Sequence, residues 1–128
     1  MMAKFLTTLK VEDISDSVWR LLEPLIYESD IVGKITVPAG FYTDLASVPR
    51  IPIVFMFFGE RSHHEAVIHD YLYRIDSMPQ VTFGEANDVF LEAMEARGKS
   101  LFIRKPMYWG VCLGGMSSYH KKKVEDKL

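Results

Sequence analysis

A histidine, an aspartate and a tyrosine fall within one short run of the sequence, HDYLY at residues 69–73. Counted from Ala66, His69, Asp70 and Tyr73 lie three, four and seven positions further on, which puts them on one face of a helix. Burying such groups without partners is costly. His69 could act as a general base with Asp70 as a metal ligand. Alternatively, they form a hydrogen-bonded cluster that pins the helix to residues 41–52, and the spacing by itself favours this cluster.

Further polar residues precede this helix. Asp44 follows a turn that contains glycine and could coordinate a cation or orient a histidine, but it could equally close its own turn. Ser47 lacks the setting of a nucleophile elbow, so nothing specific supports a triad of Ser47, His69 and Asp44. His64 lies five residues before His69, about 140° away around a helix. The spacing of a zincin-type metal site is therefore absent.

A polar residue, Asn87, interrupts the apolar face of the next predicted helix. If the two helices pack antiparallel across the short link at residues 76–81, Asn87 meets His69 and Asp70. Asp88 points about 100° away from Asn87, so we expect it to be solvated.

The elements that must position these residues are strands first and helices second. Residues typical of a pleated surface predict a small antiparallel sheet, with Pro24 at an edge or bulge, from strands at Phe5–Val11, Val18–Tyr27 and Ile31–Val37. Capping boxes begin helices at Ser62 and Thr82, and a third helix is predicted to start near Pro106. The predicted fold class is α+β, with the sheet followed by a three-helix C-terminal half.

The composition indicates one globular domain. The chain has 128 residues, 48% of them hydrophobic, and a net charge of -2, which argues against disorder. We expect a domain over residues 1–120 and a charged, frayed tail over 121–128. One cysteine, Cys112, excludes a disulfide scaffold and is interpreted as core filling on the third helix. The balance of 15 basic and 17 acidic residues disfavours a nucleic-acid partner.

Four blocks of the sequence together resemble a phage and prophage family, the one numbered 1353 among the domains of unknown function. The blocks are Val37–Pro49, Ala66–Tyr73, Glu85–Met94 and Tyr108–Gly115. The resemblance implies a viral or prophage origin and no established activity. The family usually has an acidic residue where this chain has Asn87.

The His-Asp-x-x-Tyr run is similar to that of secreted and parvoviral phospholipases A2. By this resemblance His69 would be the base that activates water, Asp70 a calcium ligand, and Tyr73 and Asn87 supports for His69. Two departures stand out: Asn87 carries no charge, and the glycine-rich calcium loop has only the Pro-Ala-Gly turn at residues 38–40 as its counterpart.

The sequence therefore supports two functions, of which we favour the first. One is a phage accessory or particle-associated protein that binds a phage or host protein, in the host cytoplasm or the virion, with Asp44 and the His69 group as a polar cluster. The other is a metal- or calcium-assisted hydrolase of the host envelope that uses His69 as base, Asp44 and Asp70 as metal ligands, and the apolar run Ile51–Phe58 for docking. That run of eight residues is too short to span a membrane, which takes about 20. An inhibitor of a host enzyme is a third interpretation.

Overall fold

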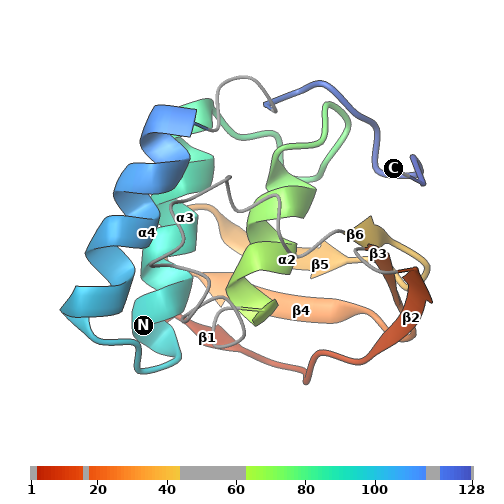
Figure 1. Cartoon of the computed structure of the whole chain (residues 1–128), viewed down its shortest axis with the longest axis horizontal. Coiled ribbons are helices and arrows are strands. Elements are labelled where there is room, and N and C mark those ends of the chain that lie inside the picture. The colour runs from red at the N-terminus through yellow and green to blue at the C-terminus, as the bar shows by residue number, and fades with distance from the viewer. Residues whose placement is uncertain (1–2, 16–17, 44–62, 115–118, 128) are drawn as a thin grey trace.

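The computed structural model describes residues 3–15, 18–43, 63–114 and 119–127. Within these residues, strands fill the N-terminal half and three helices fill the C-terminal half (Figure 1). The predicted α+β class is therefore confirmed. Asp44, Ser47, Ser62 and the apolar run Ile51–Phe58 lie outside the described residues.

The described strands form two small antiparallel sheets rather than the one sheet predicted. The first sheet has the order β1 (Lys4–Phe5), β4 (Leu25–Ser29), β5 (Gly33–Val37), and the second has the order β2 (Val11–Ser15), β3 (Val18–Leu21), β6 (Tyr42–Thr43). The predicted strand at 18–27 is wrong, because Pro24 separates β3 from β4 and each half joins a different sheet. The predicted strand at 5–11 is likewise divided between β1 and β2, which belong to the two sheets.

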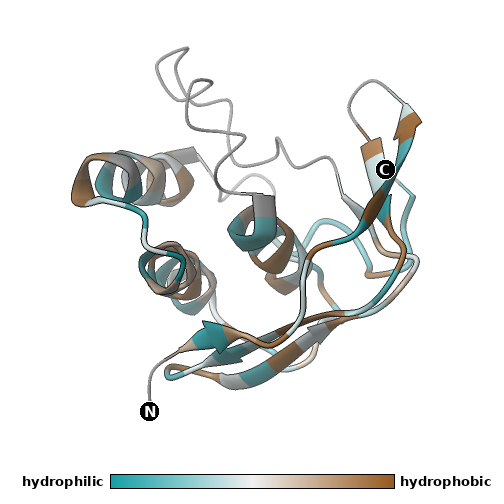
Figure 2. Ribbon diagram, turned by 90° about the horizontal axis from the view of Figure 1, so that it is seen from below, coloured by the Kyte–Doolittle hydropathy of each residue, from teal (hydrophilic) through white to brown (hydrophobic). Residues whose placement is uncertain are grey.

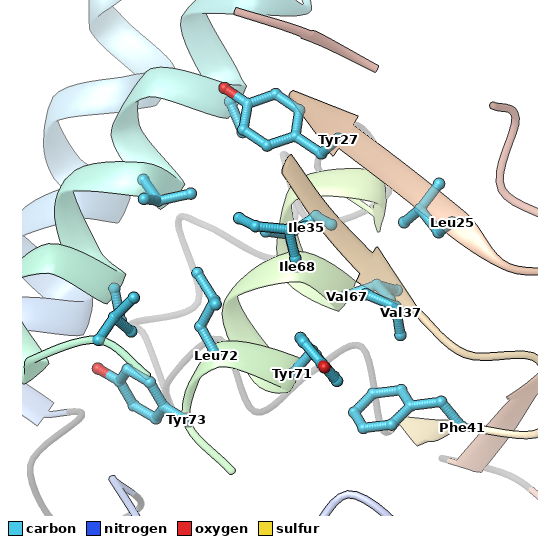
Figure 3. Packing of buried hydrophobic residues seen from close by; sticks show 14 of the residues in the cluster. Leu25, Tyr27, Ile35, Val37, Phe41, Val67, Ile68, Tyr71, Leu72 and Tyr73 are labelled. Carbon is cyan, nitrogen blue, oxygen red and sulfur yellow. The ribbon is translucent and has the colours of Figure 1, made fainter. Parts of the chain in front are cut away.

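The hairpin of β4 and β5 supplies the floor of the main core. Tyr27 pairs with Ile35 and Leu25 with Val37, so the alternation of a strand puts all four side chains on one face. All four are fully buried. Figure 3 shows them facing the apolar side chains of α2 (His63–Leu72), among them Val67 and Ile68.

The next two helices, α3 (Phe83–Ala96) and α4 (Leu101–Gly114), complete the described fold. The predicted capping box is present, since Thr82 Oγ1 accepts from the Glu85 N–H at 3.1 Å and Glu85 accepts from the Thr82 N–H at 2.9 Å. Gly98, at φ +79°, follows the end of α3 as predicted.

The predicted start of the last helix near Pro106 is wrong, because α4 begins five residues earlier. The Arg104 N–H donates to the Ser100 carbonyl at 2.9 Å and closes a first turn well before the proline. Pro106 then removes one bond, to the carbonyl of Phe102.

The three helices form a layer over the strands, with α3 between α2 and α4 (Figures 1 and 2). One apolar cluster joins α2 and α3 to the hairpin, and a second joins α3 to α4 through Phe90, Met94, Met107 and Val111. None of the described helices is long and apolar enough to cross a membrane. The chain then returns to the end of α2, where the Tyr73 carbonyl accepts from the His120 N–H at 2.7 Å.

Candidate functional site

His69 projects from α2 into the space between α2 and α3. Its side chain is only 2% exposed, and its ring lies against the rings of Tyr73, 4.1 Å between centroids, and Phe90, 4.9 Å. Helical spacing explains the first contact, because Tyr73 lies four residues after His69. His69 is therefore enclosed by aromatic side chains from both helices.

Asn87 of α3 joins the polar atoms of this cluster. Its Oδ1 lies 2.9 Å from His69 Nε2 and accepts from the Tyr73 hydroxyl at 2.7 Å. An amide oxygen only accepts, so Nε2 carries the imidazole proton and donates it. The amide Nδ2 of Asn87 lies 3.8 Å from Cys112 Sγ on α4. We call these four residues the His69 cluster; it ties all three helices together.

The surroundings keep His69 neutral. Burial lowers the pKa of His69 from 6.5 to about 4, and the bond to Asn87 offsets this only in part. A carboxylate at position 87 would stabilise the imidazolium, but an amide has no charge to do so. Burial also raises the pKa of Tyr73, so its hydroxyl remains a donor. At neutral pH the cluster is therefore an uncharged network, and His69 is a weak proton acceptor.

Asp70 follows His69 in the chain but forms an ion pair with an arginine side chain. Its carboxylate lies 3.3 Å from Arg74 Nη2, one helical turn further along. Arg74 is itself buried: it donates to the Tyr42 carbonyl at 3.2 Å and to the Lys123 carbonyl at 3.4 Å, and it lies 5.0 Å above the ring of Phe41. Asp70 thus takes part in a contact between α2, β6 and the C-terminal segment.

The predicted residues therefore fall into two groups. His69, Tyr73 and Asn87 come together, and Asp70 lies on the Arg74 side. Asp44 is outside the described residues, so its pairing with Asp70 as a metal site stays a prediction. The described part of the chain holds no group of three or more metal-binding side chains. Asp88 is exposed, as predicted, and accepts from the Tyr108 hydroxyl at 2.8 Å.

A buried carboxyl group, that of Glu65, was not among the site residues predicted from the sequence. Its side chain is fully buried at the start of α2, and Arg97 Nε lies 3.4 Å from its Oε1. Neither oxygen has a hydrogen-bond partner among the described residues. Burial raises the pKa of Glu65 from 4.5 to about 7, against the opposing charges of Arg97 and Lys99. The one sequence signal for the burial of Glu65 is its position in the first turn of α2.

Glu65→Gln is expected to stabilise the protein relative to wild type as pH rises. The pKa of Glu65 is higher in the folded protein than in the unfolded chain. As pH rises from about 4.5 to 7, the unfolded chain therefore releases this proton before the folded protein does, and the stability of the wild type falls. The wild type should lose about 3 kcal/mol relative to the glutamine variant across this range. Urea denaturation of both proteins at pH 4.5, 6 and 8 measures the difference. Glu28→Gln, at a partly exposed position on β4, is the control and should leave the profile unchanged. A Glu65→Gln difference that is constant with pH would contradict the prediction.

The comparisons with known proteins identify a family. The sequence profile described as "Protein of unknown function (DUF1353)" matches residues 19–111. The chain belongs to this family. The matched residues include most of β3, all of β4, β5, β6, α2 and α3, and most of α4. They contain His69, Tyr73 and Asn87 of the His69 cluster, whereas Cys112 lies one residue beyond the match. Neither the curated proteins nor the solved structures gave a significant match.

Proposed function

We propose that the protein is an accessory or particle-associated protein of a bacteriophage or prophage, and that it acts by binding a phage or host protein. The observation that carries the binding role is the enclosure of His69. The residue with the best-placed catalytic chemistry is 2% exposed, lies between two aromatic rings and is held neutral. The phage origin rests on the resemblance of the four sequence blocks described above.

The binding role fits the chemistry of the cluster. A general base works best when its pKa is close to the working pH, whereas the pKa of His69 is about 4. Asp70, the proposed calcium ligand, has Arg74 as a neighbour at 3.3 Å. A cation beside a carboxylate weakens its attraction for a second cation. The same groups serve well as a structural network, because they satisfy one another between three helices.

One observation favours the second candidate, a metal- or calcium-assisted hydrolase. Because Nε2 donates to Asn87, the proton-free nitrogen of His69 is Nδ1. His69, Tyr73 and Asn87 thus have the relation that the phospholipase resemblance predicts. In this alternative, His69 Nδ1 accepts a proton from water, and Asp70 with Asp44 holds the cation.

A hydrolysis assay separates the two functions. The protein is incubated with Ca²⁺ and phosphatidylglycerol vesicles, or with purified peptidoglycan, and the products are measured. We expect no product above background from the wild type or from His69→Gln. Asn87→Asp is included because a carboxylate there would raise the pKa of His69 and accelerate a hydrolase. Hydrolysis that His69→Gln abolishes without unfolding the protein would overturn the binding role.

A further inference from the structure

The outer face of α4 carries a stripe of large apolar side chains that the rest of the described structure leaves exposed. Phe102, Trp109 and Leu113 are 85%, 60% and 88% exposed. They are seven and four residues apart, so a helix aligns them along one side. We call these three residues the α4 stripe. The opposite side of α4 is buried, with Met107 and Val111 packed on α3, and in Figures 1 and 2 α4 lies at the edge of the helical layer.

An apolar helix face of this kind marks a binding surface. A helix that is apolar on both sides is normally covered on both. Single exposed apolar residues are ordinary, but three large ones in line form a patch. Two of the three are aromatic, and tryptophan is favoured where an apolar phase meets water.

The charges beside the stripe are basic. Residues 98–114 contain Lys99, Arg104 and Lys105 and no acidic residue, although the whole chain has a net charge of -2. Arg104 pairs with Glu95 of α3 at 3.1 Å. Lys105 is exposed and lies between Phe102 and Trp109 along the helix. Apolar and aromatic side chains flanked by lysine are typical of helices that lie on an anionic lipid surface.

The size of the stripe also favours a lipid surface over a second copy of the chain. Side chains of this kind bury about 150–250 Å² each, so the three together offer roughly 500 Å². A stable protein interface buries about 800 Å² on each partner. Insertion into a membrane interface has no such minimum, because the lipid adapts to the side chains that enter it.

We propose that the outer face of α4 binds the surface of an anionic phospholipid membrane through Phe102, Trp109 and Leu113, with Lys105 at the headgroups. The proposal rests on the binding role given above and adds a partner to it. It does not depend on the His69 cluster. The protein lies on the membrane surface, with the stripe at the boundary between headgroups and acyl chains.

Vesicle flotation and the fluorescence of Trp109 test the proposal. Vesicles contain phosphatidylglycerol and phosphatidylcholine, and a Trp19→Phe background leaves Trp109 as the only tryptophan. We expect the protein to float with these vesicles, the emission of Trp109 to shift to the blue, and brominated lipids to quench it. Phe102→Ser with Leu113→Ser should lower the partition coefficient about a hundredfold. Lys105→Ala should weaken binding to anionic vesicles only.

Matched controls make the outcome specific. Leu22→Ser with Ile31→Ser removes two half-exposed apolar side chains elsewhere and should leave vesicle binding unchanged. No flotation of the wild type, or equal flotation of the stripe variant, would overturn the lipid proposal. A wild-type dimer in sedimentation that the stripe variant dissociates would overturn it in favour of a second copy. Failure of the binding role is distinct, because it appears as His69-dependent hydrolysis.

Discussion

Replacing His69 by alanine is expected to lower the free energy of unfolding at pH 7 by about 3–4 kcal/mol. The change removes a buried ring packed between Tyr73 and Phe90 and leaves a cavity there. It also takes one of the two donors from Asn87 Oδ1. Urea denaturation measures the loss. Leu22→Ala, at a half-exposed site, is the control and should change stability by less than about 0.5 kcal/mol.

The same residue should make stability depend on pH in the acidic range. The pKa of His69 is lowered to about 4 in the folded protein, so the unfolded chain takes up the proton first as pH falls from about 6.5. Wild-type stability relative to His69→Gln should therefore fall by about 3 kcal/mol between pH 6.5 and 4. The stability contributed by Glu65 rises as pH falls, but Glu65 is present in both proteins, so the comparison with His69→Gln cancels its effect.

For the alanine variant, a free energy of unfolding within about 1 kcal/mol of the wild-type value would contradict a structural role of His69.

Replacing Arg74 by alanine is expected to lower the free energy of unfolding by about 3–5 kcal/mol, which is similar to the loss expected for His69→Ala. The guanidinium is buried, so its removal leaves Asp70 without this partner and two carbonyl groups, those of Tyr42 and Lys123, without a donor. The contact with the ring of Phe41 is lost as well. Thermal and urea denaturation measure the loss of stability.

The Arg74 variant should also loosen the C-terminal segment. The Ile75 N–H donates to the Lys122 carbonyl at 2.8 Å, and Arg74 holds the next carbonyl, so hydrogen exchange at Ile75 should accelerate. Arg104→Ala is the matched control, because its partner Glu95 is 70% exposed and such pairs are worth about 1 kcal/mol or less. Equal losses in the two arginine variants would contradict the buried role of Arg74.

Local patterns predicted the helices that carry the cluster. The capping box at Thr82 sets the start of α3 through bonds within four residues, and the spacing from His69 to Tyr73 follows from helical geometry. The meeting of Asn87 with His69 followed from the antiparallel packing of two helices joined by a short link. Such features depend on neighbours in the sequence, so the sequence could predict them.

Contacts between distant segments were not predictable in the same way. Arg74 reaches Lys123, and Glu65 meets Arg97, across separations that no short motif encodes. The separation from Asp70 to Arg74 was the one local sign of a buried ion pair. The early start of α4 also depends on tertiary packing, because burial of Met107 and Val111 on α3 outweighs the bond lost at Pro106.

The pKa of His69, measured by NMR titration of its imidazole, tests most directly whether the cluster is structural. The ring should stay neutral down to about pH 4, with its proton on Nε2 and with slow exchange of that proton. A His69 pKa of about 6.5 or higher would contradict the buried network and favour a catalytic base. A proton on Nδ1 would contradict the hydrogen bond from Nε2 to Asn87.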